Sequence, residues 1–367
     1  MKLESKMLSR FFNKLNEIEA NYCVMNNYIN MPEVIPSDVD IAIDKTSFGK
    51  LDQLVTELAN EFSVSITQKI WHGFNKCAFI LSPLDTEKYF WLQLDFFVDF
   101  SGKGFPNLMP FSTMIKNKAQ YKNFYIPAPE VEVPFILQRR IFKGDASHAH
   151  IKTIRSLIKD DFDIINRGNR AIFDKEASDI LKDLIVSGDI SLFDENYSFL
   201  RKALKSVSNK NTNMSYRLEY ILFQFIRALY RIIYPTGLSI AFVSNDLERT
   251  KKIIDSIDER ISGSFHGTSY VEPESLRQLS KMHLKSVLWP KITKRKVYIN
   301  LQLSILREKN TLLYKLLTYL KVTPDLDFVM DDMTIDIKMY TYLILKKQAQ
   351  RTKRSLFNSL SPTAKFK

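Results

Sequence analysis

The sequence predicts an α+β mixed sheet in residues 1–145, a helical bridge in residues 146–234 and an α/β domain with a basic tail in residues 235–367. Three observations predict this organisation. In the first part, short strand-like segments alternate with amphipathic helical ones. From about 151 to 232, apolar residues recur at helical spacing throughout. At 238–243, an apolar run follows a Pro-Thr-Gly turn and precedes a helix, as a buried parallel strand does.

The elements of the first part follow from its apolar pattern. Helices are expected over 7–20 and 47–62, and strands over 22–25, 37–44, 63–70, 76–82 and 90–98. Helices should cover one side of this sheet. His72 and Gly73 predict a turn between two strands, and the Gly- and Pro-rich residues 101–112 predict a loop. A helix over about 133–143 should end at Gly144.

The segment Ser37–Asp44 alternates polar and apolar residues, as a half-buried strand does. Asp38 and Asp40 should therefore project on one face, about 7 Å apart along the strand. Two such carboxylates repel each other unless a cation lies between them, and Mg²⁺ prefers carboxylates combined with phosphate oxygens. Asp95 lies between Leu94 and Phe96 in a later strand and needs a partner if it is buried. The alternative is a solvent-facing strand edge with two charges.

A strand, a polar turn, a Ser-Asp-x-Asp strand and a later strand with a third aspartate resemble the DNA polymerase β-like nucleotidyltransferase fold. The stretch YCVMNNYINMPEVIPSDVDIAID is similar, more narrowly, to nucleotidyltransferase-like proteins of bacterial polysaccharide and O-antigen clusters. The resemblance implies Asp38, Asp40 and Asp95 as catalytic and Mg²⁺-binding residues. It implies Asn26, Asn27 and Ser37 as nucleotide-binding residues, with a nucleoside triphosphate as substrate. Asn26-Asn27 stands where the superfamily has Gly-Ser.

The last part resembles the P-loop of thymidylate-kinase-like domains, in a degenerate form. After the strand at 238–243, only Asp246 matches the phosphate-binding loop pattern, and Thr250 stands in place of its lysine. Since glycines let such a loop wrap a phosphate, we expect no ATP binding here. A helix at 312–317 and the Pro324-Asp325-Leu326 strand are a second, fainter resemblance to the same kinases. The two strands, 238–243 and about 326–330, should lie side by side and parallel.

Composition places the chain among ordinary globular proteins, with 45% hydrophobic and 26% charged residues in 367. Cys23 and Cys77 are expected as core residues without a disulfide. We expect a cytoplasmic protein, because no signal-peptide core or membrane-spanning apolar run is found.

Residues 281–367 hold 18 Lys and Arg against 6 Asp and Glu, which accounts for the whole net charge of +12. A basic tail suggests an anionic partner such as a membrane surface, a phosphorylated carrier or nucleic acid, or else only a solvated face. The two clusters within it are Lys291, Lys294, Arg295 and Lys296, and Lys346, Lys347, Arg351, Lys353 and Arg354. Lys347, Arg351 and Arg354 would share one helix face that could rest on the inner membrane.

Further cations and histidines lie after residue 138. Arg139, Arg140 and Lys143 are expected mainly as surface charge, with contact to a substrate phosphate as the alternative. His148 and His150 are expected as a loop pair that lacks the further ligands zinc requires.

The favoured function is a Mg²⁺-dependent nucleotidyl or phosphoryl transferase. The resemblance implies a glycan, a sugar phosphate or a lipid-linked precursor as acceptor, in surface polysaccharide synthesis. Asp95 would act on the acceptor hydroxyl, as a general base or through a shared metal. The alternatives are an inactive scaffold of a polysaccharide-assembly complex and a nucleotidyltransferase toxin or defence protein. Nucleic acid is the less favoured partner, since the chain has no defined RNA-binding motif.

Overall fold

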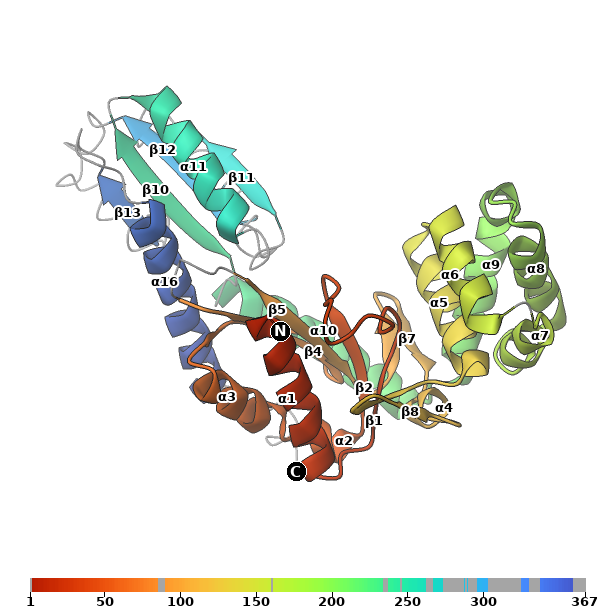
Figure 1. The fold of residues 1–367 in the computed structure, drawn as a ribbon. Helices are drawn as coiled ribbons and strands as arrows, with labels where there is room; N and C mark the ends of the chain where they lie inside the picture. Colours follow the sequence, from red (N-terminus) through yellow and green to blue (C-terminus); the bar gives the residue numbers. More distant parts are fainter. Residues whose placement is uncertain are drawn as a thin grey trace. The chain divides into compact units, whose positions relative to one another are not determined.

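A computed structural model describes most of the chain (Figure 1). The described residues are 2–84, 90–159, 161–233, 237–244, 246–261, 267–272, 287, 289, 296–302, 325–329 and 337–358. The chain divides into two compact units. The first contains residues 1–58, 71–78 and 93–224, and the second contains 59–70, 79–92 and 225–367. The domain boundaries expected at 145 and 234 stay a prediction.

The predicted strands of the first 100 residues and the first helix are present with ends shifted by a few residues, whereas the helix expected over 47–62 is divided into α2 and α3. The helices are α1 Leu3–Glu17, α2 Lys45–Phe48, α3 Leu51–Glu61, α4 Phe111–Met114, α5 Pro129–Lys143, α6 His148–Ile158, α7 Asp163–Arg170, α8 Lys175–Ser187, α9 Ser191–Lys210, α10 Met214–Ile233, α11 Leu247–Ile261 and α16 Ile337–Asn358. The strands are β1 Tyr22–Val24, β2 Val39–Ile43, β3 Ser65–Gly73, β4 Lys76–Ser82, β5 Leu92–Phe97, β6 Phe100–Gly102, β7 Phe105–Met109, β8 Ala119–Tyr121, β9 Phe124–Ile126, β10 Leu238–Ser244, β11 Thr268–Val271, β12 Lys296–Gln302 and β13 Leu326–Val329.

A mixed five-stranded sheet has the order β1-β2-β5-β4-β3. β1 and β2 are antiparallel, whereas β2 and β5 are parallel. All five residues of β2 are buried, because the strand lies between two neighbours in the sheet. Phe11 of α1 packs edge-on against Phe96 of β5, so α1 covers the sheet beside that strand.

Two local predictions are wrong. Residues 101–112 are not a loop, since β6 and β7 form an antiparallel pair there and α4 follows. Gly102 is needed in this pair because an added Cβ would come within 2.3 Å of the Phe142 ring. His72 and Gly73 are not a turn either, since both belong to β3. Gly102 therefore allows the Phe142 ring to approach the backbone of β6, and Gly73 is the last residue of β3.

The expected helical stretch is present as α6 to α10, and α6 to α9 share one apolar core with α5 and the sheet. Cys23 of β1, Phe135 of α5 and Leu200 of α9 all belong to this core. Cys23 and Cys77 are buried and are not joined in a disulfide, as expected. A continuous core fixes α5 against the sheet, which decides where the side chains of α5 point.

The second unit contains a four-stranded parallel sheet of order β11-β12-β10-β13. The predicted parallel pairing of residues 238–243 with 326–329 is confirmed. α11 packs on this sheet (Figure 1). Asp246, the one match to a phosphate-binding loop, accepts a hydrogen bond from the Arg249 N–H at 2.9 Å, which is the bond of a helix N-cap. The parallel sheet is present, but the described residues of this unit do not identify a P-loop kinase.

Asp325, in the second kinase-like segment, has structural partners. Its carboxylate accepts hydrogen bonds from the Ser239 N–H at 2.8 Å and from the Arg351 guanidinium. Arg351 is therefore held within the fold, and the membrane-facing role expected for it stays untested. The helix expected at 312–317 and Lys291, Lys294 and Arg295 lie outside the described residues. Among the described helices, none combines the length and apolarity that crossing a membrane requires.

Candidate functional site

The three predicted aspartates come from two adjacent parallel strands. Asp40 of β2 and Asp95 of β5 are direct partners in the register of the pair. Asp38 immediately precedes β2 and, two residues from Asp40, projects on the same face. Strand alternation therefore accounts for two members of the group, and the β2–β5 pairing brings in the third.

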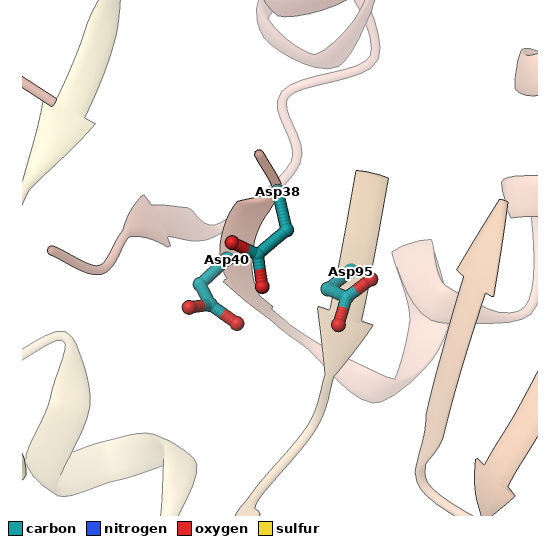
Figure 2. A group of neighbouring side chains, drawn as sticks. All are labelled: Asp38, Asp40 and Asp95. Carbon is teal, nitrogen blue, oxygen red and sulfur yellow. The ribbon is translucent and has the colours of Figure 1, made fainter. Parts of the chain in front are cut away.

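The carboxylates of Asp38, Asp40 and Asp95 lie close together in Figure 2, and one oxygen from each lies within 4.8 Å of the others. The predicted convergence is confirmed. Asp40 and Asp95 are each only 7% exposed, so the alternative of a solvent-facing strand edge is wrong. The side chain of Asp38 is 26% exposed and opens the group to solvent.

Burial shapes the charge of Asp95. Burial first, and then the neighbouring Asp40, raise the pKa of Asp95 to about 6. Gln93 partly offsets this by donating a hydrogen bond from Nε2 to Oδ1 of Asp95 at 2.9 Å. Near neutral pH this carboxylate is ionised. Keeping its charge buried beside Asp40 costs folding free energy, and a nearby cation would remove that cost.

Arg139 of α5 reaches this group, and its assignment to surface charge is wrong. Its guanidinium donates a hydrogen bond to Oδ2 of Asp40, and Nη2 lies 3.7 Å from Oδ2 of Asp38. The Arg139 side chain is only 17% exposed. The positive charge holds the two carboxylates of the Asp-x-Asp segment in place.

The turn after β1 contains the predicted nucleotide-binding residues Asn26 and Asn27. Both adopt left-handed conformations, with φ of 71° and 56°, which asparagine tolerates better than most residues. The N–H of Met25, one residue earlier, donates to the backbone carbonyl of Asp40 at 2.8 Å, so the turn begins beside the Asp-x-Asp segment. Asparagine thus preserves a backbone shape that glycine would favour at the place of Gly-Ser.

Glu132 of α5 anchors this turn and was not singled out in the sequence. It accepts a hydrogen bond from the Tyr28 hydroxyl at 2.6 Å and another from the Asn26 N–H. Burial raises the pKa of Glu132 to about 7. Glu132 and Arg139 are seven residues apart, or two helical turns, and so lie on one face of α5. The seven-residue spacing of these two charged residues was the signal in the sequence that could have indicated which face of α5 contacts the site.

Ser37, the third residue predicted to bind nucleotide, donates its hydroxyl to Oδ1 of Asp38 at 3.0 Å. This bond orients the most exposed carboxylate of the group. Nucleotide binding by Ser37, Asn26 and Asn27 stays a prediction.

More positive charge lies beyond Arg139 at the end of α5. Burial, followed by the nearby Arg139 and Arg140, lowers the pKa of Lys143. Arg140 forms an ion pair with Asp145 at 3.1 Å and lies 2.9 Å, Nη1 to Nε2, from His150. His150 and His148 belong to α6, so the expected loop pair is wrong. Burial and Arg140 lower the pKa of His150, and the Nε2 of a neutral imidazole can accept a hydrogen bond from the Arg140 guanidinium.

The donor set fits a divalent cation that prefers oxygen. Three carboxylates with converging oxygens, two of them nearly buried, match the ligand chemistry of Mg²⁺. The mixed sheet with this group of aspartates is compatible with a nucleotidyltransferase fold.

No protein-family model matches the chain, and no curated protein matches it. Among solved structures, the crystal structure of JHP933 from Helicobacter pylori is similar over 63% of this chain and 96% of that chain. The identity is 10% and the TM-score is 0.30, too low for an argument about fold or function.

Proposed function

We propose that this protein is a Mg²⁺-dependent nucleotidyl or phosphoryl transferase whose reaction centre is formed by Asp38, Asp40 and Asp95. The observation that carries the proposal is the convergence of their oxygens to within 4.8 Å of one another. Carboxylates this close repel one another, and burial strengthens the repulsion. The guanidinium of Arg139 offsets one of the three negative charges, and a bound divalent cation would offset the other two.

The cation would be held by these three carboxylates and, when bound, would supply charge neutralisation and polarisation of a phosphoryl oxygen. Asp95 accepts the proton of the acceptor hydroxyl at its carboxylate. This carboxylate is ionised at neutral pH, because its pKa is about 6 without a cation and would fall when a cation binds beside it. Arg139 keeps Asp40 and Asp38 in position while the base acts.

The nucleotide would approach from the side of the turn and of the end of α5. Asn27 of the left-handed turn is exposed, and the exposed Lys143 adds positive charge at the end of α5. Both features favour a polyphosphate. The acceptor in this proposal is a glycan, a sugar phosphate or a lipid-linked precursor, which rests on the resemblance of residues 22–44 to proteins of polysaccharide clusters.

Calorimetric titration with Mg-ATP, Mg-CTP, Mg-GTP and Mg-UTP tests the binding step. We expect at least one nucleotide to bind the wild type and binding to be lost in Asp38→Ala. The matched control is Asp183→Ala, an exposed aspartate of α8. If the wild type binds none of the four nucleotides, or if Asp38→Ala binds them unchanged, the transferase proposal is wrong. The inactive scaffold would then be the better description.

A further inference from the structure

A cavity of about 390 Å³ lies in the first unit, away from the three aspartates. This volume falls in the usual range for small-molecule sites. Its walls come from five regions: the end of β7, α4, the start of α5, α7 and the end of α9. Five converging elements make a concave site rather than a flat surface.

The base of the cavity is apolar and firmly held. Leu108 and Met109 of β7 and Val131 of α5 are each at most 4% exposed. The carbonyl of Leu108 accepts hydrogen bonds from Nε2 of Gln138 at 3.3 Å and from Nδ2 of Asn211 at 3.1 Å. These bonds tie β7 to α5 and to the end of α9, so the base is preformed.

The wall between α7 and α5 is equally constrained. A Cβ on Gly168 of α7 would lie 2.5 Å from the backbone oxygen of Glu130. The two helix backbones therefore touch at this point, and the shape of the cavity does not depend on a flexible side chain.

The rim is mostly cationic. Lys116, Arg167 and Lys210 line the cavity from three different regions and are exposed, whereas Glu130 is the one carboxylate among the described lining residues. Arg167 also lies 3.6 Å from Asp161, but both side chains are more than half exposed, so this pair is weak. The oxygen Oε1 of Glu130 already accepts a hydrogen bond from Asn117 at 3.3 Å. The rim thus has an excess of positive charge over an apolar base.

We propose that this cavity binds a small anionic amphiphile, a molecule with one apolar ring system or chain and one phosphate, sulfonate or carboxylate group. The apolar part rests on Leu108, Met109 and Val131, and the anionic group lies among Lys116, Arg167 and Lys210. Guanidinium and ammonium groups together suit a phosphate or carboxylate.

This site is distinct from the carboxylate group. Glu130 at the cavity and Arg139 at the aspartates are nine residues apart on α5, or about 13 Å along the helix axis. The proposal therefore does not depend on the transferase function and is tested separately.

The probe is 1-anilinonaphthalene-8-sulfonate, which combines an apolar ring system with one sulfonate and fluoresces when bound. The cavity variants are Ala171→Trp, an exposed lining position where the indole would fill the mouth, and the double variant Lys116→Glu/Lys210→Glu. Controls are Lys175→Glu on α8, Ile221→Ser on the exposed apolar face of α10, and Asp38→Ala. Circular dichroism confirms that each variant is folded.

We expect saturable binding by the wild type and about tenfold weaker binding by each cavity variant, the effect of a few lost contacts of ordinary strength. Added salt should weaken probe binding more in the wild type than in the double variant, because salt screens the lysine charges that the variant lacks. The three controls should bind as the wild type does. Unchanged affinity in the double variant, or a loss in Asp38→Ala, would overturn the proposal. If Ala171→Trp does not fold, the double variant decides.

Discussion

Replacing Asp95 with asparagine should stabilise the protein at neutral pH when no divalent cation is present. The buried carboxylate is ionised there despite a pKa raised to about 6, against an ordinary value of 3.8. A difference of about 2 in pKa corresponds to roughly 3 kcal/mol of folding free energy. Asparagine removes this cost and its amide oxygen can still accept the hydrogen bond from Gln93. We therefore expect Asp95→Asn to gain up to roughly 3 kcal/mol.

The pH dependence has a definite sign. The folded-state pKa of Asp95 is raised, so its contribution to stability is fully present below the unfolded value near 4. That contribution is lost as pH rises through about 6. The wild type should lose stability across this window, and Asp95→Asn should lose less. Glu132, whose pKa is raised to about 7, adds a loss in the same direction to both proteins. The difference between the two curves therefore isolates Asp95.

The assay is urea unfolding followed by circular dichroism, at pH values from 4.5 to 7.5, with chelator and again with Mg²⁺. Magnesium should stabilise the wild type and have little effect on Asp95→Asn, since the cation relieves the same repulsion that the substitution removes. The exposed variant Asp183→Asn should behave as the wild type. Equal stability and equal pH slopes of wild type and Asp95→Asn in chelator would refute the reasoning.

Three further predictions concern other parts of the chain. Arg139→Gln leaves Asp40 buried without its ion pair and should cost about 3–5 kcal/mol in chelator, measured by urea unfolding, with partial recovery on adding Mg²⁺; stability equal to the wild type would contradict this. Gly168→Ala should cost about 1–3 kcal/mol because its Cβ meets a backbone oxygen, whereas Gly73→Ala, with ordinary contacts, should not lower the melting temperature as much. The protein should float with anionic vesicles at low salt. It should be released at 1 M salt, where the Debye length is about 3 Å. Protein that stays at the bottom of the gradient at low salt would show that the basic tail is only solvated.

Patterns of polar and apolar residues predicted the structure correctly where residues close in sequence determine the direction of the side chains. Asp38 and Asp40 share a face because strand side chains alternate, and the apolar run at 238–243 is a parallel strand because only a fully buried strand is apolar on both faces. Local rules failed for residues 101–112. Their glycine and proline content predicts a loop, yet Gly102 is there to admit the ring of Phe142.

The sequence by itself determined the identity of the three carboxylates and the strand segments that contain or adjoin them, but not Glu132, which lies just before the helix expected over 133–143. Only the tertiary structure decided that β5, rather than β3 or β4, lies next to β2, which places Asp95 directly beside Asp40. It also decided that α5 presents Arg139 to these carboxylates rather than to solvent. The physical reason is that strand order and helix docking depend on burial of a shared core between residues about a hundred positions apart, and no local pattern of polar and apolar residues specifies which distant faces meet.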